Sequence, residues 1–298
     1  MGLLGNLFKK KEEMIEAFDS NGNKIFIEKS EWLKVFLHNI KQAWNDSDKL
    51  YNYITMALED GFHSEVLDAC MRLHEIDNNH ERGTTILGIC YMKNGRYQDA
   101  KDLFDNYIDK NGESGVIYVN YAKIFAELKD EKKAEELLLK SLKLDPNIDN
   151  AVQWWGAIHH ERNGEKGFLE SMKQLSDIKG SWRPQLWLVQ DYLKNKSIDM
   201  AKKYIKDILE ISSNNSDALY MISGELGKNG YLNEVLEYIV PVYKPEIHGP
   251  MPALNILRTY LEIKDKKSGI DLLSRIMSFN WQPYNEHWNY YKSEFNKI

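Results

Sequence analysis

The sequence predicts an all-α protein made of about seven helical hairpins in a line, with a short capping element at each end. Three observations lead to this prediction. The 298 residues contain only 7 prolines and 18 glycines, and residues that favour helices are abundant. Apolar residues recur at the i, i+3, i+4, i+7 spacing of amphipathic helices. Small and large apolar residues also recur together at intervals of 34 positions.

The composition excludes several classes of protein. Apolar residues make up 43% and charged residues 28% of the chain, which is typical of a folded chain that is neither disordered nor embedded in a membrane. A net charge of −6 argues against nucleic acid as a partner, because phosphates require a positive surface. Cys70 and Cys90 are too few for a disulfide framework, so we expect free, buried thiols in a reducing compartment.

The first eleven residues combine a short apolar run with Lys9, Lys10 and Lys11. The run is too short for a signal peptide and precedes its charges, and Asn6 stands where a myristoylation signal needs Ser or Thr. We therefore expect a frayed tail and a cytoplasmic protein. Contact of residues 1–11 with an anionic membrane surface remains an open alternative.

Residues 17–27 predict a short β-hairpin around Asn21-Gly22. The alternating Asp and Asn residues of this segment also suggest a calcium loop. That reading fails because Gly22 stands at the fourth instead of the sixth position, and Ser30 occupies the twelfth position, where a Glu is needed.

A capping helix is expected next, with Ser30 as its N-cap and its end near Trp44. Its apolar face would cover the open side of the first hairpin unit. The residues of that face are Trp32, Phe36 and Ile40.

Seven units then follow with a period of 34 residues, except for one step of 33. Their expected starts are Ser47, Glu81, Gly115, Asp149, Trp182, Ser216 and Pro250. In the repeat family that this spacing resembles, position 8 of a unit is small because its two helices approach closely there, and position 24 is a core slot. Position 15 lies in the turn between the helices and holds Gly61, Gly95, Lys129, Asn163, Lys196, Gly230 and Lys264.

This pattern resembles the tetratricopeptide repeat, in which W-x2-L-G-x2-Y is followed by A-x3-F and then by Pro. The second unit matches it with Gly88, Tyr91, Ala100 and Phe104, and Pro146 closes the third unit. The resemblance covers most of the chain and implies a right-handed α-solenoid. The expected organisation is a tail, hairpin and capping helix over residues 1–46, a solenoid over 47–283, and a C-terminal capping helix over 284–298.

Two features mark the far end of the array. Pro241 falls inside the second helix of the sixth unit and is expected to truncate or kink it. Beyond Pro283, aromatic residues at helical spacing predict the final capping helix, and these residues are Tyr284, His287, Trp288, Tyr291 and Phe295.

No motif predicts chemistry. The sequence has no nucleophile elbow, phosphate-binding loop or dinucleotide-binding loop. His160-Glu161 begins like a zinc-protease motif, but Gly164 replaces its second His. His159 and His160 are adjacent on a helix, so their rings point about 100° apart and one zinc ion does not easily take both. We predict no enzyme activity, no catalytic residue, no metal site and no cofactor.

By the resemblance, the first helices of the units line a concave groove through their positions 2, 5, 6, 9, 12 and 13. Trp154 and Trp187 take the same slot in successive units, and rings beside amide and cationic donors suit a peptide groove. Packing alone is the alternative role for both tryptophans. We expect the groove to be aromatic and mildly basic, and its candidate residues are Asn120, Lys123, Gln153, Trp154, His160, Arg183, Trp187, Gln190, Lys194, Tyr220, Asn255 and Arg258.

These features predict a non-catalytic scaffold or adaptor that binds a peptide or an extended protein segment. A peptide-responsive regulator or sensor remains the alternative, although the residues before the array are too few for a DNA-binding domain. An enzyme or a membrane-surface assembly factor is less favoured. The co-chaperone clamp for heat-shock protein C-termini is not expected, because Thr85 and Ile89 occupy the slots that need Lys and Asn, and only Asn120 fits.

Overall fold

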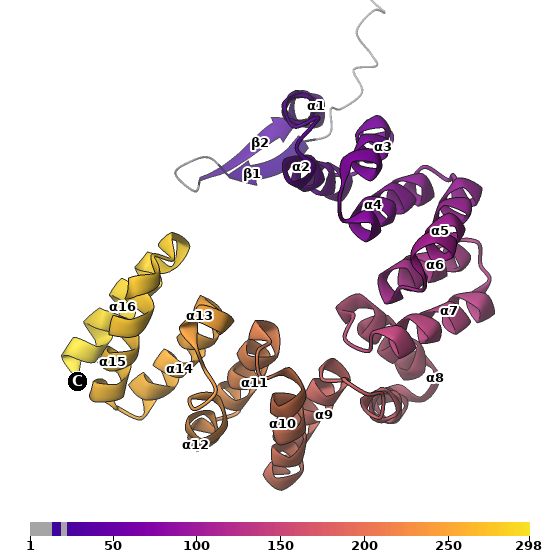
Figure 1. Ribbon diagram of the computed structural model, residues 1–298. Helices are drawn as coiled ribbons and strands as arrows, with labels where there is room; N and C mark the ends of the chain where they lie inside the picture. Colours follow the sequence, from indigo (N-terminus) through magenta and orange to yellow (C-terminus); the bar gives the residue numbers. More distant parts are fainter. Residues whose placement is uncertain (1–13, 19–22) are drawn as a thin grey trace, which may run out of the picture. The chain divides into compact units, whose positions relative to one another are not determined.

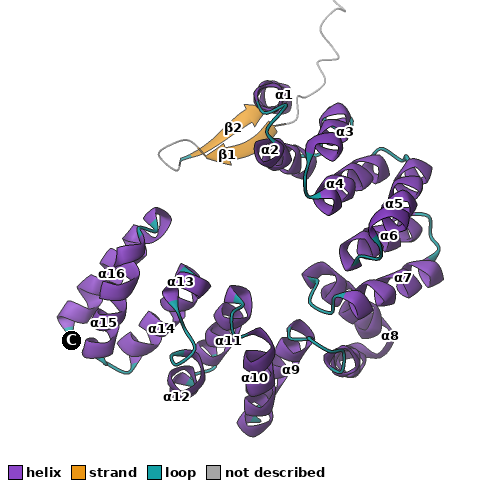
Figure 2. Ribbon diagram, in the orientation of Figure 1, coloured by secondary structure: helices purple, strands orange, loops and turns teal. Residues whose placement is uncertain are grey.

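The computed structural model describes residues 14–18 and 23–298, so the expected N-terminal tail and the Asn21-Gly22 turn lie outside the described residues. The described residues form one β-hairpin followed by a succession of α-helices (Figures 1 and 2). The chain divides between Leu137 and Leu138 into two compact units, which we describe separately. The predicted all-α helical-repeat fold with its small hairpin is confirmed.

The first unit contains the hairpin, a capping helix and the first helix pairs. Its elements are β1 (Met14–Phe18), β2 (Lys24–Glu28), α1 (Lys29–Gln42), α2 (Ser47–Glu59), α3 (Leu67–Ile76), α4 (His80–Lys93), α5 (Tyr97–Asn111), α6 (Gly115–Glu127) and α7 (Glu131–Leu144), which runs past the division.

The second unit continues the pairs and ends in a single helix. Its elements are α8 (Asp149–Ser176), α9 (Arg183–Lys194), α10 (Ile198–Ser212), α11 (Ser216–Lys228), α12 (Leu232–Glu234) with a π-helical continuation (Val235–Ile239), α13 (Pro245–His248), α14 (Pro250–Glu262), α15 (Lys266–Ile276), two 3₁₀ turns (Met277–Phe279 and Gln282–Tyr284) and α16 (Asn285–Lys297).

Polar side chains cap several of the first helices one residue before they begin. The Asp46 carboxylate accepts a hydrogen bond from the Lys49 amide of α2 at 3.1 Å. Ser114 caps α6 and Asn215 caps α11 in the same way. Each cap satisfies a backbone N–H that has no partner inside its own helix. This local chemistry explains why these helices start where they do.

The turns between paired helices share one backbone conformation. The residue at position 15 has a positive φ in six of the seven pairs. For example, φ is 72° at Gly95 and 64° at Lys129. In each of these turns the next amide reaches back to a carbonyl five residues earlier, as the Asp130 N–H does to Phe125 at 2.9 Å. This is the hydrogen bond of a Schellman motif, which ends a helix and prefers glycine at the left-handed position.

Lysine at the left-handed position carries a steric cost that glycine does not. We expect Lys129→Gly to raise the free energy of unfolding by about 0.5–1 kcal/mol, because the relief of strain exceeds the extra entropy of the unfolded glycine. Urea unfolding measures the change. The matched control is Lys203→Gly, on the exposed face of α10, which should lower stability by about 1 kcal/mol. Destabilisation by both substitutions would contradict the prediction.

The N-terminal hairpin is antiparallel, with Met14 opposite Glu28 and Phe18 opposite Lys24. Strand β2 passes directly into α1, whose N-cap is Glu28 in an extended conformation with no side-chain cap. The expectation that Ser30 caps this helix is therefore wrong. Because no loop separates the strand from the helix, the helix begins one residue before Ser30, which lies inside its first turn.

Helix α1 covers the first helix pair as predicted. Phe36 and Ile40 are buried in one apolar cluster with Leu50 and Ile54 of α2. Trp32 packs at the edge of this cluster, and its indole N–H donates to the Asp60 carboxylate at 2.8 Å. The cluster buries apolar surface that α2 and α3 would otherwise expose.

Both cysteines are free and buried in this cluster, as expected. The Cys90 thiol donates to the His63 carbonyl at 3.2 Å. Hydrogen bonding with Cys90 and burial raise the pKa of the Cys70 thiol. Cys70 therefore stays protonated and packs as a small apolar side chain.

Pro241 truncates the second helix of the sixth pair, as predicted. The helix passes into a π-helical turn over Val235–Ile239, and the Val240 N–H donates to the Val235 carbonyl at 3.1 Å. Proline has no N–H to continue the ladder, so the chain leaves the helix at this point. The short α13 that follows contacts the residue just after α10 through His248, whose Nε2 lies 2.7 Å from the Ser213 carbonyl.

Helix α16 packs on α15 and covers the end of the second unit. Trp288 and Phe295 are fully buried in the same apolar cluster as Leu272 and Leu273 of α15. This confirms the predicted C-terminal capping helix. The Phe295 ring fits because Gly269 of α15 has no side chain, and a Cβ atom there would lie 2.2 Å from the ring.

Candidate functional site

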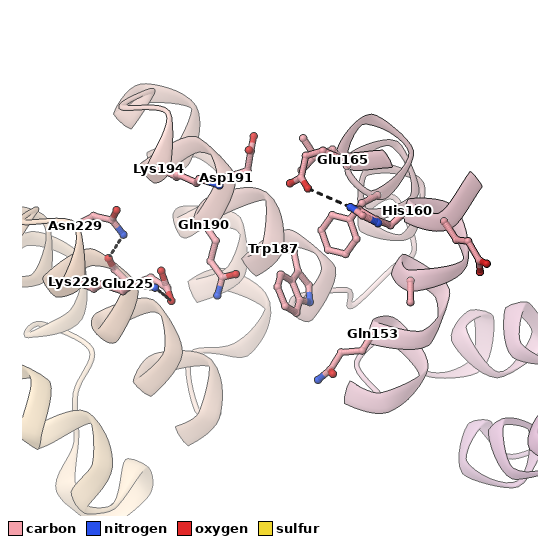
Figure 3. A pocket seen from close by; sticks show the side chains of 14 residues that line it. Gln153, His160, Glu165, Trp187, Gln190, Asp191, Lys194, Glu225, Lys228 and Asn229 are labelled. Atoms are coloured by element: carbon pink, nitrogen blue, oxygen red, sulfur yellow. Dashed lines mark hydrogen bonds and ion pairs between the residues drawn. The ribbon is translucent and has the colours of Figure 1, made fainter. Parts of the chain in front are cut away.

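The second unit contains an open hollow of about 1000 Å³ between α8, α9 and α11 (Figure 3). We call it the α8–α11 hollow. Side chains from the fourth, fifth and sixth pairs line it, and most of them belong to first helices. The lining residues are Gln153, Ala157, His160, Glu161, Glu165, Phe168, Leu169, Trp187, Gln190, Asp191, Lys194, Glu225, Lys228 and Asn229.

An aromatic pair forms the apolar part of the hollow. The rings of Trp187 from α9 and Phe168 from α8 lie 5.5 Å apart, edge to face, with an interplanar angle of 84°. Both side chains are half-buried, so each keeps a surface open to the hollow. Leu169 and Ala157 extend the apolar surface. The pair offers a large and rigid contact area at low entropic cost.

A break in α8 places part of its second half beside the hollow. Gly164 has a φ of 62° and Asn163 is also non-helical, so the element is two helices joined by a two-residue break. The second helix starts at once, and its first turns contribute Glu165, Phe168 and Leu169 to the lining. In this pair the residue with a positive φ is Gly164, one residue after position 15, and its ψ of −155° is extended.

Polar groups surround the rings. Gln153 and Gln190 supply amide donors and acceptors on the two sides of Trp187 (Figure 3). The hollow also holds four carboxylates and only two lysines, and those residues are Glu161, Glu165, Asp191, Glu225, Lys194 and Lys228. The expectation of a mildly basic groove is therefore wrong for this hollow. Two of these carboxylates, Asp191 and Glu225, lie at position 10 of their units, which the candidate groove positions leave out.

Two acidic side chains of the hollow lie within 4.0 Å of a basic side chain. Lys228 lies 3.8 Å from Glu225, and this carboxylate is mostly buried while the lysine is exposed. His160 Nε2 lies 4.0 Å from the Glu165 carboxylate, and both side chains are exposed (Figure 3). Asp191 accepts a hydrogen bond from the Asn195 amide at 2.9 Å. Negative charge remains in excess after the Lys228–Glu225 pair is set aside.

Five of the twelve residues proposed from the sequence line the hollow. They come from two neighbouring pairs and are Gln153, His160, Trp187, Gln190 and Lys194. Trp154 is half-buried and does not line the hollow, although it takes the same repeat position as Trp187. The two tryptophans therefore have different surroundings.

Two other proposed residues connect successive pairs. Arg183 donates from Nε to the Asn147 carbonyl at 2.8 Å and from Nη1 to the Asp149 carboxylate at 3.0 Å. Its side chain is only 13% exposed, so little of it is open to a ligand. The Asn255 amide donates to the Tyr220 carbonyl at 3.0 Å and to the Ser223 hydroxyl at 2.9 Å. These contacts hold neighbouring pairs together.

The remaining candidates lie outside the hollow. In the first unit, Asn120 is buried and donates to the Val116 carbonyl at 2.8 Å, while Lys123 donates to its side-chain oxygen at 3.1 Å. Burial and the nearby Lys93 lower the pKa of Lys123. In the second unit, Tyr220 is exposed, and Arg258 pairs with Glu262 at 2.8 Å on α14.

Sequence reasoning missed nine of the lining residues. Ala157, Glu161 and Lys228 occupy positions 9 and 13, which were already expected to face the groove, so the repeat register could have found them. Glu165, Phe168 and Leu169 belong to a second helix, and only the break in α8 brings them to the hollow. Their repeat positions carry no signal for a groove.

The described residues show no group of three or more His, Cys, Asp and Glu side chains that could hold a metal ion. The two adjacent histidines point to different surroundings, because the His159 ring packs against Trp155 with centroids 4.6 Å apart and an interplanar angle of 52°, while His160 lines the hollow. Within the described part of the chain, no helix is long and apolar enough to cross a membrane.

Comparison with known families identifies the repeat. Residues 72–156 match the family model of the tetratricopeptide repeat. This segment covers α4 to α7 whole, with the left-handed turn at Gly95 and the Ser114 cap. This segment of the chain is therefore made of tetratricopeptide repeats. Its fold is that of a protein–protein interaction scaffold, and proteins of this family are generally non-catalytic. Among curated proteins, none matches the sequence.

Several solved structures are similar to this chain at low identity. One is the C-terminal part of a repeat protein of the same family from Cytophaga hutchinsonii, at 14% identity and a TM-score of 0.38, over 81% of this chain and 98% of that one. Another is YrrB, described as having an unusual peptide-binding site, at 16% identity and a TM-score of 0.33, over 63% and 97%. A third, Naa15/Naa10 bound to HypK, has 12% identity and a TM-score of 0.37 over 85% of this chain, which spans 39% of the matched chain.

Proposed function

We propose that this protein is a non-catalytic adaptor whose α8–α11 hollow binds a peptide or an extended segment of a partner protein. The observation that carries the proposal is the edge-to-face pair of Trp187 and Phe168, which is left open in a hollow of about 1000 Å³. Large half-exposed rings in a concave site are typical of binding hot spots.

The polar groups around the rings support an extended ligand. Gln153 and Gln190 each carry a donor and an acceptor, which is the combination that a peptide backbone requires. The lining spans the first helices of three successive pairs, so a segment of several residues can lie across them. A small rigid molecule would use only part of this surface. The proposed ligand is therefore a chain segment.

We expect Trp187→Ala to weaken binding at least tenfold, because it removes the larger ring of the pair and the contact area it offers. Peptides are first selected from a random display library on the full chain, and their dissociation constants are then measured by fluorescence anisotropy. The matched control is Trp44→Ala, because Trp44 is 37% exposed and lies in the first unit.

Thermal unfolding followed by circular dichroism checks that both variants remain folded. The proposal predicts that Trp44→Ala binds the selected peptides like the original chain, while Trp187→Ala does not. Equal binding by Trp187→Ala and the original chain would remove the hollow from consideration as the binding site.

A further inference from the structure

We propose that the segment bound in the α8–α11 hollow carries a Lys or Arg side chain next to a large apolar one. The inference rests on the proposed function and adds the chemistry of the ligand. Two properties of the hollow lead to it, namely the excess of carboxylates around its rim and the position of these carboxylates beside an aromatic surface.

The carboxylates come from three helices and surround one space. Glu161 and Glu165 lie on the two sides of the break in α8, Asp191 comes from α9 and Glu225 from α11. Like charges that gather in one concave site raise the local negative potential, and field lines concentrate there. A bound cation relieves this repulsion, whereas an acidic ligand increases it.

The lysines of the hollow do not neutralise this charge. Lys228 is engaged by Glu225 at 3.8 Å, which leaves Lys194 to face the three other carboxylates. Among the residues that the structure describes, the ion-pair partner of Glu165 is His160 at 4.0 Å, and that histidine is charged only when protonated. A cationic side chain of the ligand would pair with the carboxylates that the lysines leave uncompensated.

The aromatic pair favours a ligand in which an apolar side chain stands next to the cationic one. A guanidinium or ammonium group is attracted to the face of a tryptophan ring, and its aliphatic stem packs on apolar surface. Phe168 and Leu169 lie beside Trp187 and offer a further contact for an apolar side chain of the ligand. Charge and apolar area together favour a basic and apolar segment over a basic segment alone.

The test starts from a random nonapeptide library selected on the full chain at 50 mM salt. We expect the selected peptides to be enriched in Lys or Arg next to Trp, Phe, Leu, Ile or Met, and depleted of Asp and Glu. Selected peptides are then synthesised with each Lys or Arg replaced by Gln. This replacement should weaken binding at least tenfold at 50 mM salt, and the difference should shrink at 500 mM salt because salt screens exposed charges.

The double variant Glu161→Gln and Glu165→Gln should weaken binding of the basic peptides at least fivefold while leaving their neutral versions unchanged. The matched control is Glu170→Gln with Glu210→Gln, since both glutamates are exposed and lie outside the hollow. Neutral or acidic peptides whose binding depends on Trp187 would overturn this inference and leave the proposed function intact. A library that yields no Trp187-dependent binder would overturn both.

Discussion

Gly88→Ala should lower the free energy of unfolding by about 2–3 kcal/mol, although alanine is the better helix former. Gly88 lies in the middle of α4, where a Cβ atom would be 2.2 Å from the Phe104 ring of α5. Phe104 is fully buried, so its ring has no free space to occupy. The two helices must then separate or the ring must leave its rotamer, and both responses cost packing.

The matched control for this prediction is Gly227→Ala. Gly227 also lies inside a helix, α11, but a Cβ atom there meets nothing within 4 Å. Alanine at this position should raise stability by about 0.5–1 kcal/mol through its helix propensity. Urea unfolding and hydrogen exchange of α4 and α5 measure both effects.

A double-mutant cycle then assigns the cost to the ring. Phe104→Leu removes the ring atoms nearest to position 88, so Gly88→Ala should cost less in its presence than alone. Additive effects of the two substitutions, or an effect of Gly88→Ala as small as that of Gly227→Ala, would show that the close approach does not constrain this pair.

Asp77→Asn should lower the free energy of unfolding by about 2–3 kcal/mol at neutral pH. The Asp77 carboxylate, in the connection between α3 and α4, is 2% exposed and accepts two hydrogen bonds from Arg82, at 2.7 and 3.0 Å. It also accepts the Asn79 N–H at 2.9 Å. The estimate lies below the cost of breaking a fully buried pair because Arg82 stays partly exposed and keeps Asp48 as a second partner at 2.8 Å.

The Asp77–Arg82 pair also makes the free energy of unfolding depend on pH. Burial by itself raises the pKa of Asp77, but the hydrogen bonds from Arg82 and Asn79 outweigh it, so the pKa lies below its ordinary value. A carboxyl with a depressed pKa contributes stability fully above the pKa of the unfolded chain and loses it as pH falls through the folded value. The contribution of Asp77 should therefore decline below about pH 4.

Urea unfolding at several pH values tests this expectation. The stability difference between the original chain and Asp77→Asn should be constant near neutrality and shrink in acid. Asp99→Asn is the control, because the Asp99–Arg96 pair has both side chains more than 40% exposed and should contribute nothing measurable. A difference that stays constant down to pH 2 would show that the Asp77 charge is not involved.

The sequence predicted the helical pairs because their determinants are local. Apolar residues at helical spacing define the buried face of each helix within a few positions. The end signals are also local, since Ser114 caps the start of a first helix and Gly95 adopts the left-handed conformation that ends one. Where a longer-range constraint entered, prediction was less accurate. Strand β2 runs directly into α1, and this removed the role expected for Ser30 as an N-cap.

The candidate site depended more on tertiary structure. The repeat register predicts which face of a helix points toward the groove. It could therefore predict from the sequence that Gln153, Gln190 and Trp187 line the site. The register does not state which neighbour a side chain meets. Arg183 occupies a groove position, yet it is held by Asn147 and Asp149 of the preceding segment.

The sequence alone therefore determined that this protein is a row of helical hairpins with a cap at each end, since that follows from periodicity and turn chemistry. Only the tertiary structure decided where a ligand surface is open and what charge it carries. After the break at Gly164, Phe168 of a second helix packs against Trp187 of the next pair, and Glu165 lines the same hollow. The physical reason is that shape and charge of a concave surface arise from contacts between side chains that are distant in sequence.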